Sequence, residues 1–370
     1  MLQAEEHMTM KILICEPSGA GKLSHYTFSL CDALQALGHE VTLMTGKDYE
    51  LAGKSPAFQI ERVYSRRLPL HYIPIIEHVR RERPGAVHFQ GLRKSDYPLV
   101  RLLRRFKGLK LVYTPHHVLP HRRRFYHLPI YGWLYRAVDQ LIVHSDYDRE
   151  SILDLFNVDP ERIQVIPEGS YELYKHGRVS REEGRKRLGI PPESPVVLFF
   201  GYMSRQKGLE DLLRAFRDVR LELPESRLIV AGDPGRDRER YMALIQELGI
   251  EDAVIKRFGY IPMEDAEGIF MAADVVALPY RRAIRGPMVQ LAYTFGRPVV
   301  ATNHGVSGLV EEGRSGCTVP PGDTEALARA ITGLLQDRER LERMSARCLE
   351  LSKSRYSWKR IAEETLKLYG

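Results

Sequence analysis

The chain has 370 residues, of which 44% are hydrophobic and 28% charged. This composition is typical of a globular protein with room for two domains, and it excludes a disordered or fibrous chain. No run approaches the roughly 18 apolar residues that a membrane-spanning helix needs. The net charge of +7 is uneven, because residues 61–136 hold 17 Lys and Arg against 4 Asp and Glu. Such a basic region favours an anionic partner: a phospholipid surface, a lipid pyrophosphate or nucleic acid.

The cysteines give no sign of a metal or redox site. The four of them form no C-x-x-C pair: Cys15, Cys31, Cys317 and Cys348. The sequence therefore favours reduced thiols in a cytoplasmic protein. It also shows no dense acidic cluster suited to Mg²⁺, so we expect no metal.

The N-terminal half alternates short apolar runs with helical periodicity. KILICE at 11–16 predicts a buried strand, followed by the small-residue turn PSGAGKLS and a helix that ends at Gly38. Further strands are predicted at 41–45, 86–90, 110–114, 140–145 and 163–168. Strands that alternate with helices predict an α/β fold with a parallel, doubly wound sheet.

A second alternation of strands and helices begins at Val196. The preceding residues, 171–194, lack strand character and carry charge, a glycine and a proline pair, which predicts a linker. We therefore predict two Rossmann-like domains, at residues 10–170 and 195–355.

Four segments of the second half each combine an apolar strand, a glycine or basic turn and a helix. They read VVLFFGYMSRQKGLEDLLRAF, RLIVAGDPG, FGYIPMEDAEGIFMAADVVALPY and FGRPVVATNHGVSGLVEEGRSG. Parallel sheets build phosphate-binding crevices in this way. The order and spacing resemble the GT-B glycosyltransferases, in particular family 4, the retaining nucleotide-sugar enzymes. The resemblance extends from Lys11 over nearly the whole chain. It implies a cleft between the two domains, and a C-terminal helix, 356–370, that crosses back to the first one.

The resemblance places the donor's diphosphate on two basic residues and a helix start. Arg205 and Lys207 in GYMSRQKG fit the phosphate-binding positions, since a guanidinium fork and an ammonium both suit phosphate oxygens. Gly286 keeps its family position, and the amides of Met288 and Val289 after it are expected to cradle the diphosphate. The alternative is that Arg205 and Lys207 are solvated cations at a helix start.

The nucleotide region matches the family in one place and departs from it in another. FGYIP implies that Tyr260 and Ile261 hold the base through backbone groups, although a plain turn would look the same. The family's two glutamates, seven residues apart, fall on Ala283 and Leu291. The second of these normally binds the ribose, which a leucine side chain cannot do.

In the first half the resemblance assigns the glycine turn and one histidine. Gly21 and Lys22 lie in SGAGKLSHYT, where the family's loop approaches the donor phosphate. His116 in VYTPHHV matches a histidine that contacts the donor sugar, where it would steady charge in the transition state. The alternative for His116 is a residue that only satisfies loop carbonyls.

The segment HRRRFYHLPIYGWLYR at 121–136 combines basic and aromatic residues. Arg122, Arg123 and Arg124 precede an apolar helix, a pattern that suits an anionic bilayer surface or an anionic acceptor. We therefore expect a cytoplasmic protein with peripheral contact at the inner face of the plasma membrane. An exposed loop before a core helix is the alternative. No nucleic-acid motif is present, so we expect no nucleic-acid partner.

Together these features predict a retaining glycosyltransferase without metal or other cofactor. It would move a sugar from a UDP- or GDP-linked donor to a carbohydrate or lipid-linked acceptor, in bacterial polysaccharide, glycolipid or lipid-linked glycan synthesis. Basic residues would neutralise the leaving diphosphate in place of a metal. Two alternatives stay open: a degenerate, non-catalytic GT-B protein that scaffolds or regulates a partner transferase, and a nucleotide-sugar epimerase of the same fold.

Overall fold

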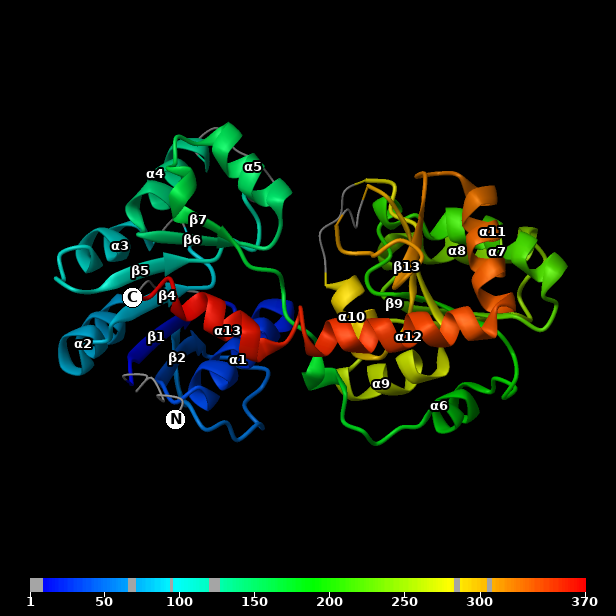
Figure 1. The fold of residues 1–370 in the computed structure, drawn as a ribbon, viewed down its shortest axis with the longest axis horizontal. Helices are drawn as coiled ribbons and strands as arrows, with labels where there is room; N and C mark the ends of the chain where they lie inside the picture. The colour runs from blue at the N-terminus through cyan, green and yellow to red at the C-terminus, as the bar shows by residue number, and fades with distance from the viewer. Residues whose placement is uncertain (1–8, 66–70, 94–95, 120–126, 283–286, 305–307) are drawn as a thin grey trace, which may run out of the picture. The chain divides into compact units, whose positions relative to one another are not determined.

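The structure is a computed structural model that describes residues 9–65, 71–93, 96–119, 127–282, 287–304 and 308–370. The chain divides into two compact units (Figure 1). Unit 1 comprises Met1–Gly169 and Tyr356–Gly370, and unit 2 comprises Ser170–Arg355. Within the described residues, no helix combines the length and the apolar character needed to cross a bilayer. The four cysteines are free and buried.

Unit 1 is built on a seven-stranded sheet with the order β3-β2-β1-β4-β5-β6-β7. All of its strand pairs are parallel. Its strands are β1 (Lys11–Glu16), β2 (Glu40–Gly46), β3 (Gln59–Tyr64), β4 (Ala86–Phe89), β5 (Lys110–Tyr113), β6 (Gln140–Val143) and β7 (Ile163–Val165). Its helices are α1 (Gly21–Ala36), α2 (Tyr72–Glu82), α3 (Tyr97–Leu103), α4 (His127–Ala137), α5 (Asp146–Leu155) and α13 (Trp358–Leu366).

Unit 2 is built on a six-stranded parallel sheet with the order β10-β9-β8-β11-β12-β13. Its strands are β8 (Val196–Phe200), β9 (Arg227–Gly232), β10 (Val254–Phe258), β11 (Val275–Leu278), β12 (Val299–Thr302) and β13 (Gly316–Val319). Its helices are α6 (Arg181–Leu188), α7 (Leu209–Glu222), α8 (Arg238–Glu247), α9 (Met263–Ala272), α10 (Met288–Thr294), α11 (Thr324–Gln336) and α12 (Arg338–Lys353). Helices cover both faces of the sheet (Figure 1).

The predicted α/β class with two doubly wound parallel sheets is confirmed. Central strands such as β8 and β11 are almost fully buried, which explains why they read as unbroken apolar runs. Strand β3, QIERVY, is not among the strands predicted from the sequence. This strand lies at the edge of its sheet and is partly exposed, so its charged residues mask the strand pattern.

Residues 171–194, expected to be a linker, lie within unit 2 and contain α6, which packs against α9. The side chain of Ser180 caps α6 by accepting a hydrogen bond from the amide of Glu183, and Gly189 ends it in the left-handed conformation. The S-x-x-E spacing is a helix-start signal that was available in the sequence. Helix α13 belongs to unit 1, where it packs against α1.

Candidate functional site

The carboxyl ends of β8 and β11 form the switch point of the unit 2 sheet. The two strands are neighbours, and the chain continues from β8 to one side of the sheet and from β11 to the other. Ligands of open α/β sheets bind where the strand order reverses in this way. The segment 201–208 follows β8 and the segment 279–282 follows β11, so both lie at this edge.

Lys207 is the half-buried cation of this switch point. Its Nζ lies 5.9 Å from the ring centroid of Tyr280 and comes close to Gly201, where a Cβ would lie 3.0 Å from it. Burial lowers the pKa of Lys207, and among the described residues no carboxylate is paired with it. An ammonium that is partly desolvated and lacks a counter-ion favours an anionic ligand.

Arg205 lies on the same turn but in a different environment. Its side chain is 65% exposed and its Nη2 lies 3.3 Å from a carboxylate oxygen of Asp237. Exposed pairs of this kind contribute little to stability, so the guanidinium can exchange Asp237 for another anion at low cost. The structure thus brings Arg205 and Lys207 together, as the sequence analysis expects.

The turn 201–208 is held in place by contacts with the segment that follows β11. A Cβ at Gly208 would lie 1.9 Å from the carbonyl oxygen of Pro279, so the two loops touch at this glycine. Arg281 donates to both carboxylate oxygens of Asp211, at 2.7 and 2.6 Å, and its amide donates to the carbonyl of Gln206. These bonds join the segment after β11 to the start of α7.

Helix α10 follows at the same edge. Met288 and Val289 are buried in its first turn, where backbone N–H groups have no intrahelical acceptor. The backbone amides of these two residues are therefore available to donate hydrogen bonds to a diphosphate. Gly286, the third residue expected there, lies outside the described residues.

Among the described residues at this edge, the position of the family's ribose-binding glutamate is taken by the apolar side chain of Leu291. Leu291 is 3% exposed and forms part of the core, and Ala283 lies outside the described residues. The neighbouring Gln290 is also buried, and its Oε1 has no hydrogen-bond partner. Tyr260 is 77% exposed and Ile261 is half-buried, directly after β10. Their backbone groups are positioned at the same edge of the sheet, two strands from β8.

In unit 1 the corresponding switch point lies between β1 and β4. The amide of Gly21 donates to a carboxylate oxygen of Glu50 at 2.5 Å, at the start of α1. Lys22 donates from Nζ to Oε1 of Glu168, also at 2.5 Å. Both groups expected at the donor phosphate are therefore engaged with carboxylates in this structure, and a phosphate would have to replace them.

His116 lies in a row of polar side chains. Its Nδ1 is 3.3 Å from Nε2 of His144, and Nδ1 of His144 is 3.0 Å from the carbonyl of Ile166. That carbonyl only accepts, so Nδ1 of His144 carries a proton. The other nitrogen of His116, Nε2, lies 3.1 Å from Oε1 of Gln90.

Burial lowers the pKa of three histidines in this row. The pKa of His116 lies well below its ordinary value, the pKa of His144 is also lowered, and the pKa of His88 is lowered to about 3. His88 is fully buried, with Nδ1 2.7 Å from the hydroxyl of Tyr369 and Nε2 2.7 Å from that of Thr114. At neutral pH these side chains are therefore uncharged imidazoles. The amide oxygen of Gln90 only accepts, so Nε2 of His116 donates to it, and a sugar hydroxyl would have to take the place of Gln90.

Among the described parts of the chain, one group of side chains could hold a metal ion, and it includes His116 and His144. Ligand atoms of His116, His144 and Glu168 lie within 4.8 Å of one another. The ammonium of Lys22, at 2.5 Å from the Glu168 carboxylate, supplies that carboxylate with a positive charge. A metal would have to displace Lys22, so the arrangement suits a hydrogen-bonding site better than a cation site.

The buried histidines predict a pH dependence for the stability of unit 1. The folded pKa of His88 is about 3 and the unfolded value is 6.5, so the unfolded chain binds more protons between these values. Stability is complete above pH 6.5 and falls as pH drops towards 3. We expect His88→Gln to reduce the slope of unfolding free energy against pH by about 1.4 kcal/mol per pH unit near pH 5.

Tryptophan fluorescence can follow this transition, because both tryptophans of the chain, Trp133 and Trp358, belong to unit 1. The matched control is His304→Gln, which removes an exposed histidine of unit 2 and should keep the wild-type slope. An unchanged slope in His88→Gln would contradict the buried, neutral state of His88.

Unit 1 also has a cavity of about 540 Å³ at the carboxyl ends of β1, β2 and β3. Arg93 and Lys47 are its cations, beside the ring of Tyr64 and Pro17. Arg93 is fixed by bonds from Nη2 to the carbonyl of Pro17 at 2.6 Å and from Nη1 to the carbonyl of Ser65 at 3.2 Å. Two cations and the carboxylate of Asp48 line this cavity, so its charged lining has an excess of positive charge.

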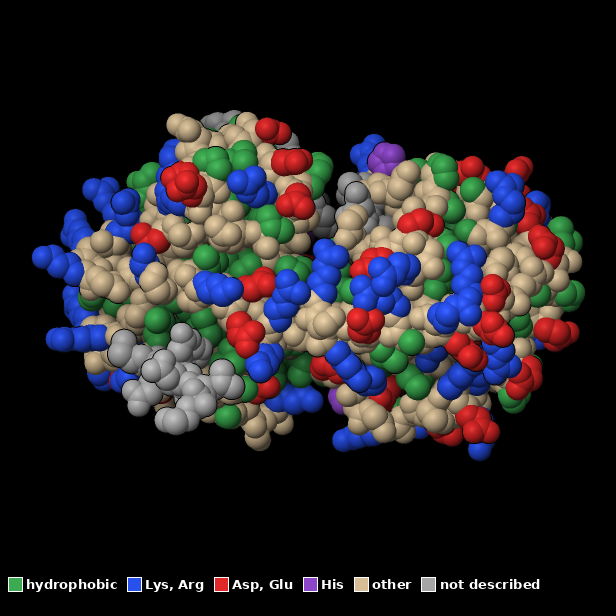
Figure 2. All heavy atoms as spheres, viewed as in Figure 1, with side chains coloured by type: hydrophobic (Ala, Val, Ile, Leu, Met, Phe, Trp, Pro, Cys, Tyr) green, Lys and Arg blue, Asp and Glu red, His purple; other side chains and the backbone are tan. Residues whose placement is uncertain are grey.

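The basic patch expected at Arg122, Arg123 and Arg124 lies outside the described residues. Other cations of the same basic region are described and exposed on and beside α2 and α3: Arg80, Arg81, Arg83, Arg101, Arg104, Arg105 and Lys107. Figure 2 shows Lys and Arg side chains along this edge of unit 1.

Three residues of the unit 1 site escaped the sequence analysis. Gln90, Glu168 and His144 are not among the residues predicted from the sequence. A signal was nevertheless present: each follows a strand at its carboxyl end, β4, β7 and β6 respectively. Parallel strands align these ends at one edge of the sheet.

The chain resembles known proteins along most of its length. The family described as Glycosyltransferase Family 4 matches residues 23–170, and Glycosyl transferases group 1 matches residues 194–337. The D-inositol 3-phosphate glycosyltransferase of Corynebacterium urealyticum is 32% identical over 72% of this chain and 67% of its own length. That of Nocardia farcinica is 31% identical over 63% of this chain. The chain spans only about half the length of this relative, 52%.

Two solved structures show the same fold. A glycosyltransferase from Rickettsia africae has a TM-score of 0.79 at 17% identity, over 98% of both chains. Anabaena HepE in complex with UDP has a TM-score of 0.78 at 19% identity, over 97% of this chain and 99% of the other. The two family matches, the relatives and the shared fold identify this chain as a member of the GT-B glycosyltransferases of family 4.

Proposed function

We propose that this protein is a retaining glycosyltransferase that takes its sugar from a UDP- or GDP-linked donor. The observation that carries the proposal is the half-buried, unneutralised ammonium of Lys207 at the switch point of unit 2. The names of the relatives and the UDP bound to HepE support a nucleotide-sugar donor.

In the proposed reaction the diphosphate leaves from unit 2 and the sugar passes to an acceptor hydroxyl. Lys207, Arg205 and the amides of Met288 and Val289 would stabilise the negative charge that develops on the leaving oxygen. These cations do the work that a metal does elsewhere, so we propose a metal-independent reaction. Retention requires that the acceptor oxygen bonds to the anomeric carbon on the face from which the diphosphate oxygen departs. Nε2 of His116 would orient a sugar hydroxyl.

The test is direct product analysis. The protein is incubated with UDP- and GDP-sugars in the presence of EDTA, and nucleoside diphosphate release and the anomeric configuration of the product are measured by NMR. Release with retained configuration supports the proposal. Inversion, or activity only after divalent metal is restored, would contradict the corresponding part of it.

The buried Leu291 favours a second candidate, a non-catalytic GT-B protein that scaffolds or regulates a partner transferase. The leucine side chain at this position has no polar atom with which to bind a ribose. A thermal-shift screen against UDP, GDP and their sugar conjugates separates the two. A ligand at 100 times its dissociation constant should stabilise the protein by about 2.7 kcal/mol. No shift with any of them would favour the scaffold.

For the acceptor we propose a carbohydrate or lipid-linked molecule with an anionic group. The cavity of unit 1 offers Arg93 and Lys47 for that group, and the relatives' name contains a phosphorylated acceptor, D-inositol 3-phosphate. A role in polysaccharide, glycolipid or lipid-linked glycan synthesis in the cytoplasm follows from this acceptor class.

We also propose peripheral contact with an anionic membrane through Arg122, Arg123 and Arg124. Their replacement by Ser should weaken cosedimentation with phosphatidylglycerol vesicles several-fold, and added salt should weaken wild-type binding. The matched control replaces three exposed arginines elsewhere by Ser: Arg329, Arg343 and Arg360. Equal loss in both variants would reduce the effect to net charge, and no binding at low salt would exclude the contact.

A further inference from the structure

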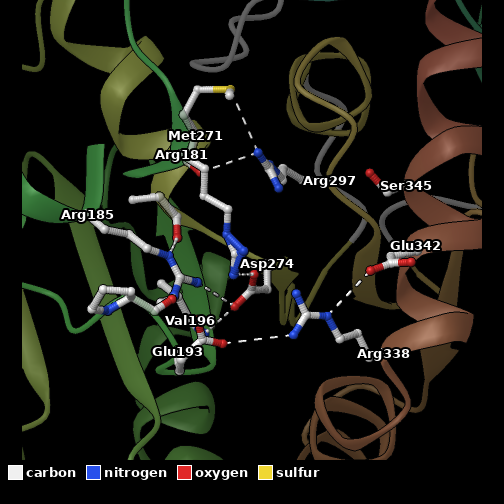
Figure 3. Close-up of polar contacts among 12 residues, drawn as sticks. Arg181, Arg185, Glu193, Val196, Met271, Asp274, Arg297, Arg338, Glu342 and Ser345 are labelled. Carbon is white, nitrogen blue, oxygen red and sulfur yellow. Dashed lines mark hydrogen bonds and ion pairs between the residues drawn. The ribbon is translucent and has the colours of Figure 1, made fainter. Parts of the chain in front are cut away.

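Unit 2 contains a cavity at the opposite edge of its sheet from Lys207. Its volume is about 700 Å³, and Figure 3 shows the polar side chains around it. Pro195, Asp274 and Arg297 line it, and these residues precede β8, β11 and β12. The cavity therefore lies at the amino ends of the strands, whereas Lys207 follows the carboxyl end of β8. A strand of this length separates the two edges by roughly 16 Å.

The carboxylate of Asp274 is already neutralised within the protein. It accepts from Arg181 at 2.5 Å, from Arg185 at 2.9 Å and from the amide of Val196 at 2.8 Å. Arg185 is almost fully buried and uses its remaining donors on backbone carbonyls, including that of Ala272 at 3.2 Å. Asp274 and Arg185 thus form the rigid wall of the cavity.

Arg297 is the surplus cation of this cavity. Its Nη2 is 3.3 Å from the carbonyl oxygen of Met271, and no carboxylate in the described parts of the chain is paired with it. Its Nε is buried without a hydrogen-bond partner, and so is Nε of Arg181. Burial, with the nearby charges of Arg181 and Arg185, lowers the pKa of Arg297 to about 10. In Figure 3 the guanidinium of Arg297 faces Met271, and Arg297 lies across the open space from Arg338.

The rest of the lining divides into an apolar wall and a polar rim. Ile190, Pro192, Leu335 and Leu341 supply the apolar part. Arg338 belongs to the rim; its side chain is 78% exposed, with Nε 3.4 Å from a carboxylate oxygen of Glu342 and Nη1 3.9 Å from one of Glu193, so a phosphate would have to replace these exposed ion pairs. A desolvated guanidinium beside an apolar wall matches a ligand with one compact anionic group and an apolar or ring portion.

We propose that this cavity binds an organic phosphate monoester, with the phosphate on Arg297 and Arg338 and the organic portion against the apolar wall. The site is separate from the donor site, and the proposal does not depend on the proposed transferase activity. It gives unit 2 two ligand sites at opposite edges of one sheet.

The test uses phenyl phosphate as the probe and isothermal titration calorimetry as the readout. The full chain carries Arg205→Ala and Lys207→Ala, so that the donor site does not take up phosphate. In this background we expect saturable binding of phenyl phosphate, tighter than that of inorganic phosphate. Arg297→Gln should weaken it at least tenfold. The rim variant Arg338→Gln should weaken it several-fold, and it is exposed enough to leave folding intact.

The matched control is Arg343→Gln, on the same helix as Arg338 but outside this cavity. It should keep the affinity of the background protein. Absence of binding in the background protein would overturn the proposal. So would an affinity that neither Arg297→Gln nor Arg338→Gln changes from that of the background protein. If Arg297→Gln fails to fold, Arg338→Gln decides the same question. Inorganic phosphate as tight as phenyl phosphate would overturn the assignment of an organic ligand.

Discussion

Replacing Lys207 with alanine is expected to weaken binding of UDP or GDP by about ten- to a hundredfold. A hydrogen bond to a charged group contributes about 1.5–3 kcal/mol, and each 1.4 kcal/mol is a factor of ten in affinity. The effect should lie towards the upper end, because the ammonium is half-buried and has no carboxylate partner among the described residues. Arg205→Ala should cost less, since Arg205 is exposed and already paired with Asp237.

The same substitution should not lower the stability of the ligand-free protein. The folded pKa of Lys207 is lowered, so between this pKa and 10.5 the unfolded chain binds more protons and stability rises with pH. Below that window both states are charged, and the folded state carries the full cost of the buried charge. Alanine removes this cost, so the melting temperature at pH 7 should stay equal or rise.

Calorimetric titration with UDP and GDP, together with thermal unfolding, measures both effects. Arg329→Ala is the control, since it removes an exposed cation of the same unit that is paired with Glu325. A nucleotide affinity unchanged by Lys207→Ala would remove Lys207 from the donor site. Reduced affinity together with a lower melting temperature would show a structural role instead.

The two units differ in how far their sites follow from the sequence. In unit 2 the candidate donor residues are local: Arg205 and Lys207 lie in the turn after β8, and Met288 and Val289 begin the helix after β11, so two strand–turn–helix patterns predict them. In unit 1 the row of Gln90, His116, His144 and Glu168 comes from four different strand ends. Only the sheet order makes those strands neighbours, and a single sequence does not show that order.

The cavity around Arg297 is less visible still in the sequence. It joins residues 181–195 and 335–345 with Asp274 and Arg297, and none of these lining residues belongs to a ligand-binding motif. Arg181, Arg185 and Arg297 read as ordinary surface arginines in charged or loop segments. Their partial burial follows from α6 packing on α9, which places two of them beside Asp274. The interpretation of 171–194 as a linker hid this packing.

Gly208 should be the position where the fold of unit 2 tolerates substitution least. Its φ is +68°, and a Cβ would lie 1.9 Å from the carbonyl oxygen of Pro279. Backbone cannot yield as a flexible side chain does, so Gly208→Ala must separate the turn after β8 from the segment after β11. We expect a loss of about 4 kcal/mol or more in unfolding free energy, which is at the extreme of single substitutions.

Gly189 is a matched control, because its φ is +67° and no atom lies within 4 Å of its Cβ position. Gly189→Ala therefore pays only the cost of a left-handed alanine, about 1 kcal/mol. Urea unfolding followed by far-UV circular dichroism measures both variants, and tryptophan fluorescence reports unit 1 separately. Similar losses in the two variants would mean that backbone conformation alone requires glycine at 208. A much larger loss in Gly208→Ala would show that the contact with Pro279 requires it, and the turn that carries Lys207 would then owe its position to that contact.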